Sequence, residues 1–251
     1  MIPGMDTTTF AAPLLQAYRE HRAVTVAADA GPASREQAYA TQRAIWQTLV
    51  GQARPTAWKV GAPTREAEPT AAPIFPHRIA ASGTHLPAAS FLGLGIEAEI
   101  AVRFGRDLPP RATRYTRDEI LDAIASVHVA IELIDTRLAA PKVAGPLWSL
   151  ADNLVNGGLI VGDAIPQWRE LDFAALTVRV SANGGVRAET QGRPPLDDLF
   201  FCLPWWIDHV GGAQAGDIVA TGAWNGMHPV GLPVTVRVDF VGVGSAEARI
   251  G

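Results

Sequence analysis

IEAEIAVRF, residues 96–104, alternates apolar residues with others along its whole length. A period of two is typical of a β-strand, because successive side chains point to opposite faces of the sheet. The apolar positions, Ile96 to Phe104, therefore predict a strand with one face in the core. Glu97 and Glu99 leave the other face together, with Cα atoms roughly 6.5–7 Å apart, a separation that two ligands of one cation can bridge.

A single Glu-x-Glu pair is more often the solvated face of an ordinary strand, so a third acid is needed to support a metal site. Glu132 supplies it, because it interrupts an otherwise apolar run from Val127 to Ile134. A carboxylate buried there would cost several kcal/mol unless it were paired or bound to metal. We therefore expect Glu97, Glu99 and Glu132 to hold one hard cation, Mg²⁺ or Mn²⁺ in preference to Zn²⁺.

Lys59 is the candidate cationic partner, since it lies between Trp58 and Val60 in a short apolar segment ending at Gly61. Desolvation there would lower its pKa and prepare it for proton transfer, or for pairing with a substrate carboxylate. The alternative is a surface lysine that buries only its stem.

The first third of the chain reads as mainly helical. Ser34 and Gln37 form a capping-box pattern and predict a helix over about 35–50. The segment 57–61 predicts a strand, and the prolines from Pro63 to Pro76 predict a stretch without regular structure.

From about residue 90 strands and turns dominate. Thr116 and Glu119 predict a helix whose apolar stripe is Ile120, Leu121, Ile124 and Val127, followed by a strand over 129–134. Asn183-Gly184 predicts a hairpin between strands at 176–181 and 186–190. Further strands are expected at 219–220 and 234–241, and a helix over 196–210 that Pro204 starts or kinks. These elements indicate an α+β fold with a closed or rolled sheet.

Composition excludes several classes of protein. The 251 residues include 25 acidic and 21 basic side chains, with no basic run, so nucleic acid is not an expected partner. The one cysteine, Cys202, cannot form an internal disulfide. We find no leader pattern in MIPGMDTTTF and no apolar run of about 18 residues, so we expect a cytoplasmic protein without a membrane span.

Five motifs stand in an order that resembles the 2-keto-4-pentenoate hydratases and the related 4-oxalocrotonate decarboxylases of the fumarylacetoacetate hydrolase superfamily. They are Trp58-Lys59-Val60-Gly61, Gly95-Ile96-Glu97-Ala98-Glu99-Ile100-Ala101, Ile131-Glu132-Leu133-Ile134-Asp135-Thr136-Arg137, Ala151-Asp152-Asn153, and Ala215-Gly216-Asp217-Ile218-Val219 through Thr221-Gly222. The resemblance implies a mixed β-roll catalytic domain over residues 86–251 and a smaller N-terminal helical, α+β lobe over 1–85. It also implies Mg²⁺ or Mn²⁺ and a homo-oligomer built from dimers.

The same resemblance implies roles for individual residues. Glu97, Glu99 and Glu132 match the metal ligands, Lys59 matches the catalytic lysine, and Asp152 and Thr221 match positions near the substrate. The chain departs from the family in two places. Thr70 stands where members commonly carry an aspartate, and Lys142 lies further upstream of Asp152 than the usual lysine, with Pro146-Leu147-Trp148 filling the gap.

The implied activity is a hydro-lyase reaction, in which water adds to a 2-hydroxy-2,4-dienoate or its 2-oxo-4-enoate tautomer and gives a 4-hydroxy-2-oxo acid. Such substrates arise in the meta-cleavage of aromatic compounds. Decarboxylation of a 2-oxo diacid, hydrolysis of an acylpyruvate and tautomerisation remain open alternatives. A hydrolase would need a histidine and a glutamate to activate water, and no histidine clearly fills that role. A non-catalytic small-molecule binding protein on this fold is the alternative from another class.

Overall fold

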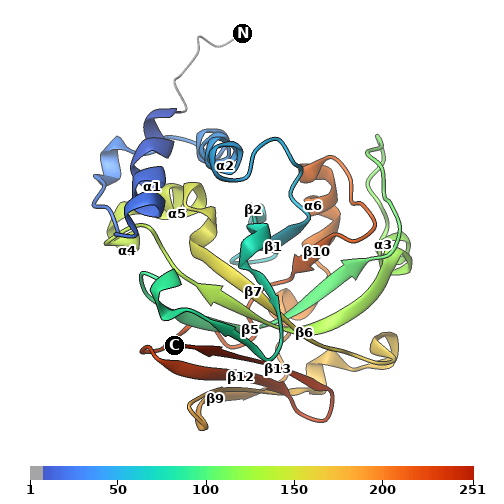
Figure 1. Cartoon of the computed structure of the whole chain (residues 1–251). Helices are drawn as coiled ribbons and strands as arrows, with labels where there is room; N and C mark the ends of the chain where they lie inside the picture. The colour runs from blue at the N-terminus through green and yellow to red at the C-terminus, as the bar shows by residue number, and fades with distance from the viewer. Residues whose placement is uncertain (1–7) are drawn as a thin grey trace.

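The computed structural model describes residues 8–251, which form three layers (Figure 1). Helices lie on one side of a central sheet, and a second sheet lies on its other side. The helices are α1 (Thr8–Glu20), α2 (Arg35–Leu49), α3 (Arg117–Ala123), α4 (Pro141–Ala144), α5 (Pro146–Ala151) and α6 (Leu203–Val210). The strands are β1 (Ala57–Gly61), β2 (Thr70–Pro73), β3 (Ile79–Ala81), β4 (Thr84–Leu86), β5 (Gly95–Phe104), β6 (Ile124–Ile134), β7 (Asn156–Ala164), β8 (Thr177–Ala182), β9 (Gly185–Gln191), β10 (Ile218–Ala220), β11 (His228–Pro229), β12 (Val234–Phe240) and β13 (Gly244–Ile250).

Both sheets are mixed. The central sheet has the order β2-β1-β10-β5-β6-β7-β3, with β11 also paired to β5, and the second sheet has the order β4-β13-β12-β8-β9. The pairs β1–β10, β3–β7 and β4–β13 are parallel, and the other pairs are antiparallel. The predicted α+β fold with a rolled, mixed sheet is confirmed.

The main core fills the space between the two sheets. The apolar face of β5, from Ile96 to Phe104, is fully buried there with residues of β8, β12 and β13 such as Val180, Val238 and Ala248. A second cluster lies under α1, α2 and α5 and includes Ile45 and Trp148. The predicted alternation of β5 is therefore confirmed, and its other face is left for the glutamates.

Several local predictions hold. Ser34 caps α2 by accepting from the Gln37 amide, and Thr116 and Glu119 form the complete capping box of α3. Asn183 and Gly184 both have positive φ, at 50° and 76°, which is the conformation that a type I′ hairpin turn requires.

Three local predictions were wrong. The proline-rich stretch contains the short strand β2, which is possible because β2 lies at the edge of its sheet, where a proline such as Pro73 removes no needed ladder bond. The helix after Thr116 ends at Ala123, and Ile124 and Val127 belong to β6, because pairing with β5 overrides the helical stripe.

The third error concerns residues 196–202, which are not α-helical. Helix α6 begins at Leu203 and Pro204 lies in its first turn, so the proline starts a helix, as one of the two options predicted.

The division at residues 85 and 86 stays a prediction, although strands from both sides of it share both sheets: β1, β2 and β3 lie in the central sheet and β4 pairs with β13. None of the helices in residues 8–251 is long and apolar enough to cross a membrane. Most of the MIPGMDTTTF segment, from which no leader was predicted, falls outside the described residues.

Candidate metal and substrate site

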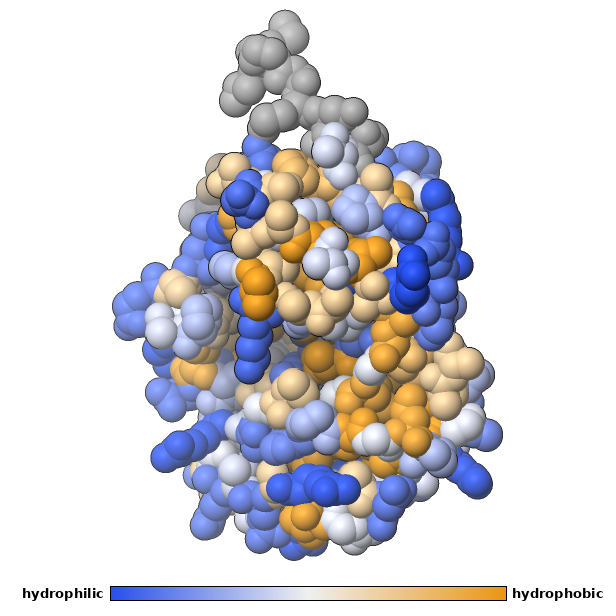
Figure 2. All heavy atoms as spheres, turned by 90° about the vertical axis from the view of Figure 1, so that its left-hand side faces the viewer, coloured by the Kyte–Doolittle hydropathy of each residue, from blue (hydrophilic) through white to orange (hydrophobic). Residues whose placement is uncertain are grey.

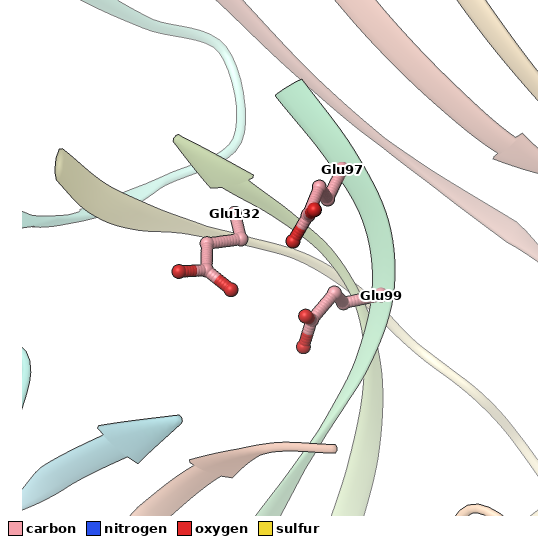
Figure 3. Close-up of side chains that lie close together, drawn as sticks. All are labelled: Glu97, Glu99 and Glu132. Carbon is pink, nitrogen blue, oxygen red and sulfur yellow. The ribbon is translucent and has the colours of Figure 1, made fainter. Parts of the chain in front are cut away.

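The three predicted glutamates meet on one face of the central sheet. Glu97 on β5 is the direct cross-strand partner of Glu132 on β6, and Glu99 lies two residues further along the same face. Figure 3 shows the three carboxylates directed toward a common space. One oxygen from each lies within 4.8 Å of the others, and Glu99 and Glu132 are 1% and 0% exposed.

Like charges placed opposite each other in a ladder repel, and burial strengthens the repulsion. Burial, followed by the charge of Glu132, raises the pKa of Glu97 to about 7. The same two causes, joined by Glu97, raise the pKa of Glu99 well above its ordinary value. Without a countercharge the three carboxylates therefore repel one another.

The donor set fits a hard divalent cation. Glu132 Oε2 is buried and has no hydrogen-bond partner, so it is free to act as a ligand. With oxygens from Glu97 and Glu99 it gives three carboxylate ligands of the kind that Mg²⁺ and Mn²⁺ prefer.

Lys59 joins this cluster from β1. Its Nζ lies 2.5 Å from Glu132 Oε1 and donates to the Leu154 carbonyl at 3.2 Å. Burial lowers the pKa of Lys59, but the charges of Glu132, Glu97 and Glu99 outweigh it, and the net pKa lies above the ordinary value. The expected lowering was therefore wrong, and Lys59 is an ammonium whose side chain is 15% exposed.

These groups open into a cavity of about 420 Å³. Lys59, Glu97, Glu99 and Thr221 line it, so the structure brings four predicted site residues together. Thr70, the residue at the family's aspartate position, also lines it, and its Oγ1 donates to the Gly61 carbonyl at 3.4 Å.

Thr221 and Gly222 form the wall behind Glu99. The Thr221 amide and hydroxyl both donate to the Ile100 carbonyl, and the Gly222 amide donates to Glu99 Oε2 at 3.1 Å. Gly222 has a φ of 112°, and a Cβ there would lie 3.3 Å from the Pro195 side chain, so glycine is needed to bring this amide to the carboxylate.

Asp152 does not line the cavity. It is buried, its Oδ1 accepts from Arg137 Nε at 2.5 Å, and its Oδ2 accepts from the Thr136 hydroxyl at 2.8 Å and from the Arg137 amide. Both carboxylate oxygens are therefore engaged within the protein, away from a ligand in this cavity.

The turn before β7, which contacts Lys59, was not predicted. Asn153, Leu154 and Val155 all have left-handed backbone conformations, with φ of 50°, 51° and 56°, and the Leu154 carbonyl of this turn accepts from Lys59. Such strain is uncommon outside glycine and is often found at functional sites.

Asn156 is a further contact that sequence reasoning missed, since its Nδ2 donates to Glu132 Oε1 at 2.8 Å. It lies three residues beyond the Ala151-Asp152-Asn153 motif. A polar residue at the start of the apolar strand β7 was the available signal.

This chain is similar in sequence to two hydratases. A 2-keto-4-pentenoate hydratase of Burkholderia vietnamiensis is 27% identical over 185 residues, which cover 72% of this chain and 70% of that protein. The 2-oxo-hept-4-ene-1,7-dioate hydratase of Escherichia coli is 24% identical over 231 residues, covering 85% and 86%.

Among solved structures, the 4-oxalocrotonate decarboxylase of Pseudomonas putida G7, in complex with magnesium and adipate, has the same fold. Its TM-score is 0.84 at 21% identity, and the match covers 98% of this chain and 97% of that one. The family model described as "Fumarylacetoacetate (FAA) hydrolase C-terminal" matches residues 46–250, and this chain therefore belongs to the fumarylacetoacetate hydrolase family.

Proposed function

We propose that this protein is a metal-dependent hydro-lyase that adds water to a 2-hydroxy-2,4-dienoate, or its 2-oxo-4-enoate tautomer, and forms a 4-hydroxy-2-oxo acid. The observation that carries the proposal is the buried cluster of three carboxylates beside Lys59, open to a small cavity. Relatives named as hydratases of such acids support the reaction type.

Glu97, Glu99 and Glu132 would hold Mg²⁺ or Mn²⁺. When bound, the cation supplies positive charge that stabilises negative charge on substrate oxygens. The 4-oxalocrotonate decarboxylase of similar fold was solved in complex with magnesium, which supports this choice of metal.

Lys59 contributes a second positive charge at the same end of the cavity. Because its ammonium is held by Glu132 and the Leu154 carbonyl, it is positioned to pair with the substrate carboxylate and to donate a proton. It does not act as a base in this state, since its pKa is raised. The apolar residues Leu154 and Leu196 in the wall would limit the access of water to the reacting bonds.

The cavity also helps to rank the alternatives. Among the described residues that line it there is no histidine, so the pair that an acylpyruvate hydrolase needs is missing from its wall. Decarboxylation and tautomerisation would use the same charged groups, and a protein that only binds 2-oxo acids would use the same cavity.

The test is turnover of 2-hydroxypenta-2,4-dienoate with Mg²⁺, followed by loss of dienol absorbance and identification of the product. Formation of 4-hydroxy-2-oxopentanoate supports the hydratase. Release of carbon dioxide from a 2-oxo diacid, or conversion of dienol to the oxo tautomer alone, identifies one of the alternatives. If these acids bind but none of them is converted, the protein is a binding protein without this enzyme activity.

A homo-oligomer built from dimers is part of the same proposal. Figure 2 shows hydrophobic residues gathered on the face that lies to the left in Figure 1, where α4 is found. Val143 on α4 is 72% exposed and Met227 is 50% exposed, and Met227 lines a hollow together with Pro141. Exposed apolar groups of this kind are typical of protein interfaces, and light scattering after size-exclusion chromatography would measure the oligomer.

A further inference from the structure

The side chains that line the cavity beside the three glutamates are charged in one part and, apart from two threonines, apolar elsewhere. Lys59 is the one cationic side chain among the described residues that line it, and it already pairs with Glu132. Apart from glycines, glutamates and threonines, the remaining wall is made of apolar residues, among them Ala62, Leu154, Leu196 and Ala223.

The two threonines in the wall do not add a donor for an anion. The hydroxyl of Thr70 donates to the Gly61 carbonyl and that of Thr221 to the Ile100 carbonyl. A hydroxyl carries a single hydrogen, so each presents only lone pairs to the cavity while these bonds hold.

Arg65 touches the wall from outside. Its Nη1 donates to the Leu196 carbonyl at 2.7 Å, and its guanidinium lies 4.5 Å from the centroid of the Phe201 ring. It lines a neighbouring hollow with Phe201 and is not among the residues that line the metal cavity. Two contacts therefore hold this charge away from a bound substrate.

We propose that the cavity selects monocarboxylic 2-oxo acids with a short apolar tail and rejects the corresponding diacids. This inference rests on the proposed function, because it takes the C1 carboxylate to lie at the Lys59 and glutamate end. A second carboxylate on the tail would then lose water against apolar side chains and hydroxyl lone pairs without gaining a charged partner, which is unfavourable for a charged group.

The test compares binding of two unreactive probes, 2-oxopentanoate and 2-oxohexanedioate, to the Mg²⁺-loaded protein by calorimetric titration. We expect the monoacid to bind at least about tenfold more tightly, as expected when one charge is left unpaired. In Leu196→Arg a guanidinium is added to the wall, and the preference should shrink by about tenfold or reverse.

Leu196 has a φ of 55°, and arginine, like leucine, is not branched at Cβ, so the backbone strain at this position is unchanged by the substitution. The matched control is Val186→Arg, which adds the same charge at an exposed position of β9 in the second sheet. This control variant should prefer the monoacid over the diacid to the same extent as the parent.

Equal or tighter binding of the diacid by the parent would overturn the inference. If Arg65→Ala then removed that diacid binding, Arg65 would be the group that binds the second carboxylate. Preference for the monoacid without turnover of the dienoate would leave the inference standing and refute the hydratase. Turnover of the dienoate together with tighter binding of the diacid would support the hydratase and refute the inference. Failure of both probes to bind would overturn both.

Discussion

Replacing Glu97 with glutamine should stabilise the metal-free protein, and only at high pH. Burial and Glu132 raise the pKa of Glu97 from 4.5 to about 7 in the folded protein. Below the unfolded value of 4.5 the carboxyl is protonated in both states, so it has no effect on stability. As the pH rises from 4.5 to about 7, the unfolded chain loses this proton first, and folding stability falls. Above about 7 the full penalty is about 3 kcal/mol.

The assay is urea unfolding in the presence of a chelator, followed by the fluorescence of the seven tryptophans, at about pH 5 and about pH 8. Glu97→Gln keeps the side-chain volume and removes the titrating carboxyl. The free energy of unfolding of the variant minus that of the parent should therefore be about 2–3 kcal/mol larger at the upper pH than at the lower one. Saturating Mg²⁺ should stabilise the parent more than the variant, because the variant lacks one ligand. If the difference in unfolding free energy between parent and variant did not change with pH, the electrostatic repulsion among the carboxylates would be refuted.

Three other changes separate the roles of the site residues. Glu132→Ala should remove tight Mg²⁺ or Mn²⁺ binding and with it turnover, because two carboxylates leave an incomplete site; calorimetry that finds the parent's affinity would exclude Glu132 as a ligand. Lys59→Met should keep metal binding but lower the turnover number by a factor of roughly 10²–10⁴. Unchanged steady-state kinetics would remove Lys59 from the site, and a rise in the Michaelis constant alone would mean uniform substrate binding. Asp152→Ala should destabilise the fold by about 3–5 kcal/mol, because Arg137 would remain buried without its countercharge; urea unfolding at the parent's midpoint would contradict this.

The glutamate cluster could be predicted because its geometry is mostly local. The spacing of Glu97 and Glu99 on a strand fixes their common face, and the apolar run around Glu132 predicts its burial. What the sequence does not specify is the register. Glu132 meets Glu97 only because β5 and β6 pair with these two residues opposite, and a shift by one residue would turn Glu132 to the core.

The pKa of Lys59 shows the limit of reasoning from neighbours in the chain. Trp58 and Val60 predict desolvation, and desolvation alone would lower the pKa. Its direction is set instead by Glu132, which lies 73 positions away in the chain and 2.5 Å away in space. The sign of the shift therefore depends on tertiary structure that periodicity cannot supply.

Asp152 illustrates how a residue can belong to a site motif without lining the cavity. Arg137 donates to Asp152 and to the carbonyls of Asp152 and Asn156, so it holds both ends of the left-handed turn between them. The carbonyl of Leu154 at the centre of that turn is the one that accepts from Lys59. We therefore expect Asp152 to position Lys59 through the backbone. Loss of the Asp152 charge should weaken the turn and displace the ammonium, whereas a residue that touched the substrate would change binding with the fold intact.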